Sequence, residues 1–502
     1  MVESTERSEP AVASAKRATE IANLIEADLM HRGWPVGEVI GTFAELIDRY
    51  SASRAVVREA IGLLEHKMVV EIRHGPGGGI EVRAPIGEAV VGSISSYLDH
   101  TGVTDIELSD LRRLLMGLAT RFAAERIDEA GIERLRAVVD RPSQLDAESP
   151  AAMINSLEVL STITELSENP ALALFWSGLI QRVAAGVAGG FMAPREIREE
   201  IARNMTEIVN LVVAGDGRAA EARMIDFFTV LYADVGAPAE RVGREEAAAV
   251  TGMQSAIRDI GISIPDLDRD RRKKLPARVV RQIVHEIRDH ELQPGDVLGM
   301  EQDLLTRLGV SRSVFREAVR IVEFYGLVEM RRGPKGGLTV REPDPRQIED
   351  IIIRYLDFMG IERHHLIEIR VALEVMNLER VLKHAHDRLP ELTEVVGREQ
   401  DGEVELSRLL ELHHVLAELS GNRASRLLSN VLSRQLSRAA VQVEEDPSVT
   451  PEEAERLFAT GHEDHLRIVE AIVAGDVGLA RHRMVRHLQG MASSVDEMER
   501  GK

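Results

Sequence analysis

Apolar residues recur every three or four positions along most of this chain, the spacing of a helix that buries one face. Within 53–68, for example, Val57, Ile61, Leu64 and Met68 fall on one stripe. Alternation of apolar and polar residues, which is typical of strands, is confined to two short stretches, 69–84 and 328–340, each with a glycine-rich turn. The pattern predicts a mainly α protein with two small β-hairpins.

Four short sequence motifs occur twice in this chain, in the same order. The pairs are SRAVVREA (53–60) with SRSVFREA (311–318), RHGPGGGIEV (73–82) with RRGPKGGLTV (331–340), ELSENPAL (165–172) with ELSGNRAS (418–425), and VVAGDGRAAEARM (212–224) with IVAGDVGLARHRM (472–484). The offset is 258 residues for the first two pairs and drifts to 253 and 260 for the later ones, as loop insertions and deletions would cause. The chain is therefore two copies of one unit.

Each copy begins with three predicted helices and a hairpin, which together make a winged helix, and continues as a helical bundle. We call the winged helices the first and second heads, and the bundles the first and second helical domains. The predicted boundaries are a disordered tail at 1–14, the first head at 15–84, the first helical domain at 85–235, a linker at 236–272, the second head at 273–343 and the second helical domain at 344–495.

Composition limits which cellular compartment and which binding partners the protein can have. The chain has no cysteine, which excludes disulfides and thiolate metal sites and fits a reducing cytosol. Residues 1–14 lack the basic start and apolar core of a signal peptide and are expected to form a loose tail, and no uninterrupted apolar run is long enough to span a membrane. The formal net charge of −21 opposes binding to a polyanion, so any DNA contact needs a local basic surface.

Such a surface is predicted at the third helix and wing of each head. Ser53 and Ser311 are suitable N-caps for these helices. Arginines four residues apart project from one face of the helix start, where they can contact guanine or phosphate in the major groove. A solvated arginine face is the plain alternative for one helix, but the whole arrangement occurs twice. The candidate DNA-binding residues are Arg54, Arg58, Arg73, His74, Arg312, Arg316, Arg320, Arg331, Arg332 and Lys335.

The stretch LLTRLGVSRSVFREAVRIVEFYGLVEMRRGPKGGLTV (304–340) closely resembles the winged helix of GntR-type transcription regulators. The bundles resemble the FadR-like (FCD) ligand-sensing domain, and the resemblance covers nearly the whole chain twice. Two departures stand out. Ser51 replaces the turn glycine that the second head keeps at Gly309, and Ala44 and Gln302 occupy the place of an arginine that the family uses on DNA.

Two histidines are predicted to face each other in the second helical domain. In both copies the letters AGD, at 214–216 and 474–476, read as a helix-ending glycine followed by the N-cap of an antiparallel helix. Residues equally far from such a turn lie opposite one another, which pairs His465 with His487. His413, on a helix predicted over ELSRLLELHHVLAELSGN (405–422), is the third candidate, and three converging imidazoles can hold a divalent metal such as zinc. Separate core or surface histidines are the plain alternative.

The resemblance to FCD domains implies more about this site. It places His413, rather than His414, with His465 and His487 on the family's three histidine positions, but the family's aspartate position holds Leu409. It also directs Arg370, and Arg112 in the first copy, into the effector cavity; Arg370 could instead pair with Glu374. The matching metal positions of the first copy are Leu160, Met205 and Phe227, with Ser156 at the aspartate place, so that copy is expected to bind no metal. Its cavity is either a filled core, which we favour, or a site for an apolar ligand such as an acyl chain.

Together these features predict a ligand-responsive, DNA-binding transcription regulator, of the repressing kind, and not an enzyme. One chain with two heads would act as a pseudo-dimer on an operator in double-stranded DNA, in the cytoplasm on the nucleoid, with a small carboxylate or acyl compound as effector. Pairing of two chains into a homodimer stays open. The alternatives are a metal-dependent helical enzyme and a DNA-binding architectural protein with relic ligand sites.

Overall fold

The computed structural model describes 9–73, 75, 78–140, 150–188, 191–192, 195–233, 240–241, 275–290, 292–331, 336–399, 406–444 and 450–500. Its contacts divide the chain into two compact units, 1–93 with 266–360 and 94–265 with 361–502. Each unit therefore combines one part of the first copy with one part of the second. None of the helices in the described part of the chain is long and apolar enough to cross a membrane.

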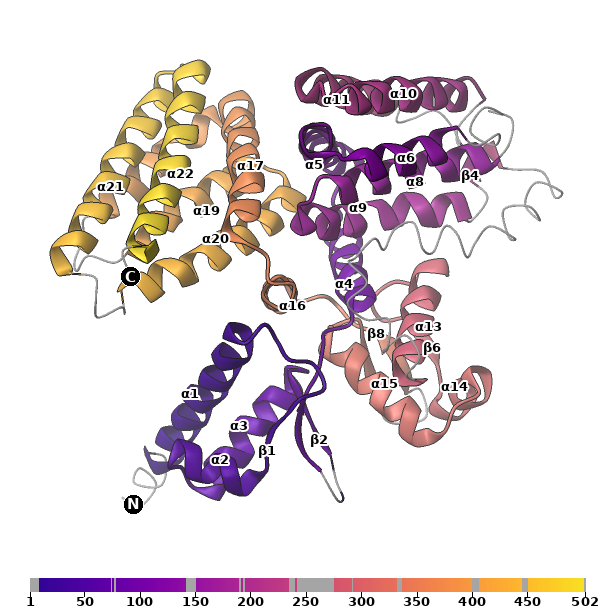
Figure 1. Cartoon of the computed structure of the whole chain (residues 1–502), viewed down its shortest axis with the longest axis vertical. Helices are drawn as coiled ribbons and strands as arrows, with labels where there is room; N and C mark the ends of the chain where they lie inside the picture. The colour runs from indigo at the N-terminus through magenta and orange to yellow at the C-terminus, as the bar shows by residue number, and fades with distance from the viewer. Residues whose placement is uncertain are drawn as a thin grey trace. The chain divides into compact units, whose positions relative to one another are not determined.

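The first unit holds the two heads, which repeat one element order (Figure 1). In the first head the elements are α1 (Glu9–His31), β1 (Val39–Gly41), α2 (Phe43–Tyr50), α3 (Arg54–His66), β2 (Val70–Arg73) and β3 (Gly79–Val82). In the second head they are α13 (Leu275–Asp289), β6 (Val297–Gly299), α14 (Glu301–Leu308), α15 (Arg312–Phe324), β7 (Val328–Arg331) and β8 (Gly337–Val340).

The predicted winged helices are confirmed, with two corrections. Each hairpin carries a third antiparallel strand, because β1 pairs with β3 and β6 pairs with β8, in the orders β1-β3-β2 and β6-β8-β7. These strands are three residues long, too short for alternation to reveal them. The predicted tail is also too long, since α1 begins at Glu9. The alanine-rich stretch that follows Pro10 favours helix, and proline is tolerated in a first turn.

The third helix of each head starts and packs as its sequence predicts. Ser53 accepts a hydrogen bond from the backbone N–H of Val56 at 3.3 Å, and Ser311 accepts one from Val314 at 3.4 Å. The stripe from Val57 to Met68 is buried in the core of the first head. The turn before each helix is left-handed at Gly309 and also at Ser51, where φ is 45°. The first head therefore holds a serine in a conformation that glycine adopts more easily.

A linker helix follows each head, α4 (Gly87–His100) after the first and α16 (Pro345–Phe358) after the second. In the first unit each linker helix contacts the head of the other copy. Ser93 on α4 donates to the backbone oxygen of Tyr325 at 2.8 Å. On α16, Arg354 donates to the buried carboxylate of Glu26 at 2.9 Å, and Phe358 meets Trp34 edge to face. The linker helices thus connect the two copies, and α16 also binds its own head, where Gln347 donates to the backbone oxygen of Phe324 at 2.7 Å.

The second unit holds the two helical domains, whose helices follow one another in matching order. The first contains α5 (Asp105–Arg126), α6 (Glu129–Val139), α8 (Pro150–Leu166), α9 (Pro170–Ala188), β4 (Phe191–Met192), α10 (Arg195–Val213), α11 (Gly217–Ala233) and β5 (Glu240–Arg241). The second contains α17 (Arg363–His384), η1 (His386–Arg388), α18 (Leu389–Arg398), η2 (Leu406–Leu410), α19 (Glu411–Leu419), α20 (Arg423–Glu444), α21 (Pro451–Val473) and α22 (Val477–Arg500).

Two expectations for this unit need correction. The first helical domain is not purely helical, because β4 pairs antiparallel with β5. Two-residue strands leave no periodicity to read, and β5 falls inside the segment 236–272 that the composition marked as a linker. The rest of that segment lies outside the described residues. The predicted single helix around His413 is also divided, into the 3-10 segment η2 and α19.

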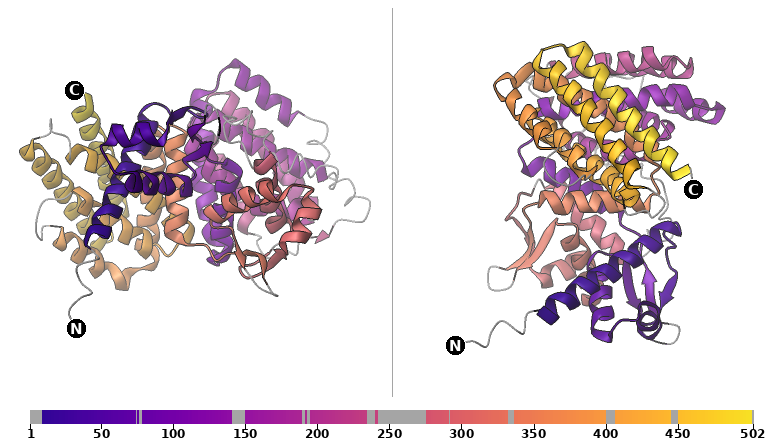
Figure 2. Two further views of the ribbon diagram at one scale, coloured as in Figure 1. Left: turned by 90° about the horizontal axis from the view of Figure 1, so that it is seen from below. Right: turned by 90° about the vertical axis from the view of Figure 1, so that its left-hand side faces the viewer.

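The antiparallel turns at AGD are confirmed in both copies. Gly215 and Gly475 are left-handed, with φ of 73° and 70°. Asp216 and Asp476 then accept hydrogen bonds from backbone N–H groups three residues on, at 3.1 and 2.9 Å. The helices α21 and α22 consequently run side by side (Figures 1 and 2).

The two helical domains are joined by contacts that mirror each other. The side-chain amide of Asn169 donates to the backbone oxygen of His365 at 2.9 Å, and that of Asn422 donates to the backbone oxygen of Glu107 at 2.9 Å. Both asparagines also accept backbone N–H bonds at the start of their own helices, α9 and α20. One residue per copy thus caps a helix and binds the other copy.

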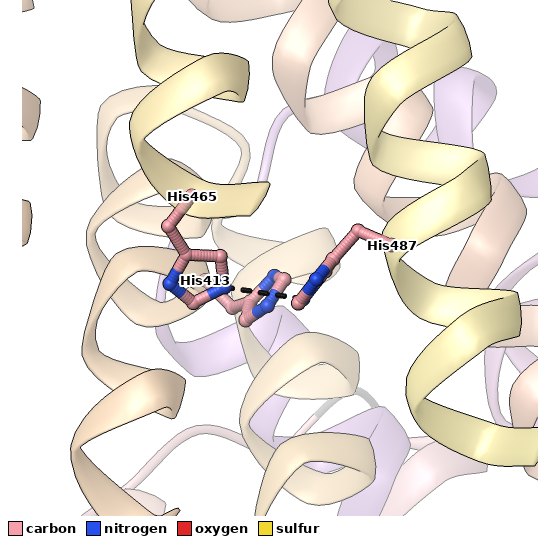
Figure 3. Close-up of side chains that lie close together, drawn as sticks. All are labelled: His413, His465 and His487. Carbon is pink, nitrogen blue, oxygen red and sulfur yellow. Dashed lines mark hydrogen bonds between the residues drawn. The ribbon is translucent and has the colours of Figure 1, made fainter. Parts of the chain in front are cut away.

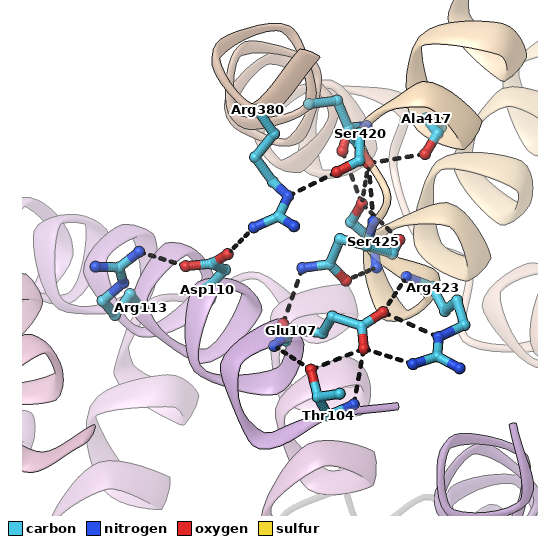
Figure 4. Close-up of polar contacts among 11 residues, drawn as sticks. Thr104, Glu107, Asp110, Arg113, Arg380, Ala417, Ser420, Arg423 and Ser425 are labelled. Carbon is cyan, nitrogen blue, oxygen red and sulfur yellow. Dashed lines mark hydrogen bonds and ion pairs between the residues drawn. The ribbon is translucent and has the colours of Figure 1, made fainter. Parts of the chain in front are cut away.

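A pair of arginine bridges follows the same symmetry. Arg126 binds the backbone oxygen of Ser167 and the carboxylate of Glu368. Arg380 binds the backbone oxygen of Ser420 and the carboxylate of Asp110 (Figure 4). The acceptors occupy matching positions of the repeat, whereas the two arginines are one helical turn out of register.

One bridge has no counterpart. Arg423 contacts the buried carboxylate of Glu107 through its backbone N–H at 2.9 Å and through Nε and Nη2 at 3.1 and 2.8 Å (Figure 4). Thr104 adds two further hydrogen bonds to that carboxylate. Burial alone raises the pKa of Glu107, but the bonds from Arg423 and Thr104 prevail and lower it to about 2. The first copy has Pro170 at the place of Arg423.

We expect Glu107→Gln to destabilise the second unit at neutral pH by about 1.5–3 kcal/mol, the range for hydrogen bonds to a charged group. Because the folded pKa of about 2 lies below the reference value of 4.5, the carboxylate stabilises the fold above pH 4.5. That contribution is lost as the pH falls from 4.5 toward 2. Thermal unfolding midpoints across this range measure the effect. The exposed Glu133→Gln is the control, and a gap between wild type and Glu107→Gln that is the same at every pH would contradict the assignment.

Candidate DNA interface and candidate metal centre

The helix arginines of both heads lie on the surface of the first unit. Arg54 and Arg58 on α3 are exposed. Among the described residues, neither lies within ion-pair distance of a carboxylate. Arg312 and Arg316 on α15 are also exposed, with 61% and 67% of their side chains accessible. None of the four is drawn into the core, so all four remain able to meet a duplex.

The heads differ in what stands beside these arginines. Glu301, the first residue of α14, places Oε1 3.2 Å from Nε of Arg312 and 3.3 Å from Nε of Arg316. The matching position of the first head is Phe43. The second head therefore sets one negative charge against two positive ones, whereas the first leaves both positive charges uncompensated. Glu301 directly precedes Gln302 in the chain, but no spacing pattern in the sequence links it to Arg312 or Arg316.

The other predicted DNA contacts are placed less uniformly. In the wings, Arg73 binds Glu81 and Arg331 binds Glu329 at 2.5 Å, so both share their charge with the sheet. Arg320 is exposed, but its Nη2 donates to the backbone oxygen of Glu65 in the first head at 3.3 Å. The remaining three candidates, His74, Arg332 and Lys335, lie outside the described residues.

The three predicted histidines converge in the core of the second helical domain (Figure 3). His413 comes from α19, His465 from α21 and His487 from α22, and all three are buried. Their candidate ligand nitrogens lie within 4.8 Å of one another, and Nε2 of His465 is 3.1 Å from Nε2 of His487. This is the one such cluster of possible metal ligands found in the described part of the chain.

The spacing of these nitrogens suits a metal ion. Two imidazole nitrogens bound to one tetrahedral zinc at about 2.0–2.1 Å lie roughly 3.3 Å apart. Burial, then the charges of Arg370 and the other histidines, holds the pKa of His413 well below its usual value. Burial also lowers the pKa of His487 to about 4, despite its hydrogen bond to Asp464. Both rings are therefore neutral at neutral pH, the form that ligates metals.

Arg370 and Glu374 lie one helical turn apart on α17, beside His413. Glu374 Oε1 is 3.3 Å from Nδ1 of His413 and 3.8 Å from Nε of Arg370. Burial raises the pKa of Glu374 to about 7, with Arg370 acting in the opposite direction. Within the described structure, Arg370 Nε and Glu374 Oε2 are buried without a hydrogen bond. Unsatisfied groups of this kind suit a polar ligand.

Leu409 does not take part in this cluster of polar groups. It is buried among Leu457 and Phe458, with Met491 packed against them, in a small apolar cluster. Its side chain also fills the space beside Gly461. The resemblance would place an aspartate at this position, but the chain has Leu409, which contributes to the apolar core and not to a metal site.

In the first helical domain the matching positions form a different interior. Leu160, Met205 and Phe227 are all buried and offer neither nitrogen nor oxygen to an ion. Arg112 is buried as well, and its Nη2 donates to the backbone oxygen of Leu179 at 2.9 Å. The apolar trio agrees with the prediction from the repeat, whereas nothing in the spacing indicated the contact between Arg112 and Leu179.

Comparison with known proteins gives the same division of the chain. The model "Bacterial regulatory proteins, gntR family" matches 17–80 and 275–337, and the model "FCD domain" matches 107–229 and 365–490. The HTH-type transcriptional regulator LutR of Bacillus subtilis is 30% identical over 211 residues, which span 40% of this chain and 92% of that protein. The chain belongs to the GntR family of bacterial regulatory proteins.

It is a tandem GntR regulator, with two DNA-binding helix-turn-helix domains and two FCD effector domains in one chain. The HTH-type transcriptional repressor NanR of Salmonella newport is another relative, 27% identical over 237 residues that span 44% of this chain and 86% of that protein. Each relative thus corresponds to less than half of the tandem chain.

We expect Glu301→Gln to strengthen binding of this GntR regulator to duplex DNA on the order of threefold to tenfold, because it frees two arginine charges. The slope of log K against log salt should also steepen, by about 0.9 for each added phosphate contact. Fluorescence anisotropy over a salt series measures both quantities.

The exposed Glu394→Gln in the second helical domain changes the net charge equally and is the control. Phe43→Glu, which copies the acidic residue into the first head, should weaken binding. Unchanged affinity and slope for Glu301→Gln would show that the carboxylate does not influence DNA contact.

Proposed function

We propose that one chain works as a complete pseudo-dimeric repressor, in which both heads read one operator and the second helical domain senses the effector. The observation that carries this proposal is the reciprocal set of contacts between the copies. Each linker helix lies on the opposite head, and Asn169 and Asn422 join the helical domains in mirrored fashion. A homodimer would obtain such contacts from a second chain.

DNA binding is assigned to the arginines at the helix starts, Arg54 and Arg58 in the first head and Arg312 and Arg316 in the second. Exposure of all four supports this role. Two heads on one chain would take half-sites about one helical turn apart. Arg73, Arg331 and Arg320 are assigned to phosphate contacts, as are His74, Arg332 and Lys335. The proposed binding to chromosomal DNA and the absence of cysteine both support a cytoplasmic location, with the protein bound to the nucleoid.

The effector site is assigned to the second helical domain. His413, His465 and His487 would hold a divalent ion such as zinc, which would supply a Lewis-acid anchor for a carboxylate. Arg370 is buried, and its Nε lies 3.8 Å from Oε1 of Glu374. It would bind the same ligand, a small carboxylate or an acyl compound. Arg112 has the matching place in the first domain, where an anionic ligand would have to displace its bond to Leu179.

Repression is proposed because the similar NanR is itself a repressor. Effector binding would then change the operator affinity by favouring one arrangement of the heads. An architectural role would leave DNA binding indifferent to every carboxylate and acyl compound offered. An enzymatic role would give a turnover that is lost with His465→Ala.

We expect the double substitution Arg312→Ala with Arg316→Ala, and equally Arg54→Ala with Arg58→Ala, to abolish specific binding to DNA fragments that the purified chain selects from its genome. The reason is that loss of either half-site leaves only non-specific affinity, typically 10³-fold or more weaker. Electrophoretic mobility shifts measure this, with the exposed Arg136→Ala on α6 as control.

Repeating these shifts with small carboxylates and fatty acyl compounds tests the effector site. Full specific affinity in either double variant would mean that the altered head does not read the operator.

A further inference from the structure

Every histidine of the cluster has a carboxylate at its outer nitrogen. Nδ1 of His465 lies 2.7 Å from Glu399 Oε1, and Nδ1 of His487 lies 3.3 Å from Asp464 Oδ2. Nδ1 of His413 lies 3.3 Å from Glu374 Oε1, in a contact without hydrogen-bond geometry. The carboxylates come from three different elements: α17, the end of α18, and α21.

Glu399 is the most constrained of the three carboxylates. Its side chain is fully buried, and its second oxygen lies 2.7 Å from Nδ1 of His462, one turn before His465 on α21. A buried carboxylate needs compensation by donors or positive charge. A carboxylate oxygen accepts from an imidazole Nδ1 that carries the proton, so the two contacts favour the Nδ1–H form of His462 and His465.

These outer contacts also orient the inner nitrogens. A ring whose Nδ1 faces a carboxylate turns its Nε2 to the opposite side. The contact between His487 and Asp464 has the same effect on the second ring. The two Nε2 atoms lie 3.1 Å apart, close enough for a hydrogen bond between them and also for joint ligation of one ion.

We propose that Glu399 and Asp464 are positioning residues of the metal site, which hold His465 and His487 so that both Nε2 atoms point at one ion. Glu374 has the corresponding place at His413. This inference rests on the proposed metal site and names the residues that determine its affinity.

The first helical domain offers an internal comparison. There the ligand positions hold Leu160, Met205 and Phe227, and the positions that match Asp464 and Glu374 hold Asn204 and Met116. Asn204 is buried, but it bonds to the backbone of its own helix at Glu200. The copy that lacks histidines at the three ligand positions thus lacks these two carboxylates too, as expected if they serve the ligand histidines.

The test is zinc affinity of the full-length chain, measured by competition with a chromogenic chelator for the wild type, Glu399→Gln and Asp464→Asn. We expect each substitution to weaken zinc binding about 10–100-fold, the usual effect of removing an outer partner of a ligating histidine. Glu463→Gln, an exposed neighbour on the same helix that pairs with Arg467, is the control and should leave the affinity unchanged.

A second measurement separates positioning from folding. The melting temperature of metal-free protein should be nearly the same for Asp464→Asn as for the wild type, because Asp464 is partly exposed. The stabilisation gained on adding zinc should shrink. If Glu399→Gln does not fold, Asp464→Asn alone decides the question.

The outcomes distinguish this inference from the proposed site itself. Zinc affinity within twofold of wild type in both carboxylate variants, with His465→Ala unable to bind zinc, would overturn the positioning role and leave the metal site standing. Zinc binding that survives His465→Ala would overturn both.

Discussion

Several buried polar groups in each copy form hydrogen bonds with residues of the other copy, and the association of the two copies depends on these bonds. Asn169 and Asn422 show this most clearly, because each caps a helix of its own domain and donates to a backbone oxygen of the other domain. A buried amide that loses its partner costs about 1–3 kcal/mol, so separating the copies would leave such groups uncompensated on both sides. The buried carboxylate of Glu26 likewise binds Arg354 from the linker helix of the other copy, in addition to Lys67 in its own head.

The contacts between the copies have been kept, whereas their functional residues have diverged. The second copy carries the histidine cluster and its carboxylates, and the first has filled the same interior with Leu160, Met205 and Phe227. In the heads the difference lies in Glu301 against Phe43. A tandem chain permits this division of labour, which two identical subunits of a homodimer cannot adopt because one gene encodes both.

Features encoded by short-range spacing could be predicted from the sequence. The N-caps Ser53 and Ser311, the turns at Gly215 and Gly475, and the opposition of His465 and His487 all follow from residues close in the chain. The contacts of the linker helices with the other copy could not be foreseen, because periodicity shows that a helix has an apolar face but not which surface covers it. Glu399 was missed since 66 residues separate it from His465, and no spacing rule links them.

Two features of the structure have a visible trace in the sequence that does not by itself reveal them. Asn169 and Asn422 both stand in the repeated motifs ELSENPAL and ELSGNRAS, which marked the duplication without revealing that the shared asparagine binds the other copy. The helix start at Glu9 was overlooked because the acidic, serine-containing stretch before it obscured a run of alanines. The DNA-contact roles of Arg54, Arg58, Arg312 and Arg316 remain predictions, which the exposure of their side chains supports.

The most direct test of the account is the mass of the specific protein–DNA complex, determined by native mass spectrometry on a duplex that carries one complete operator. The account predicts a single 55.5 kDa chain per duplex. Two chains on each duplex, at every protein concentration that gives a specific complex, would contradict it.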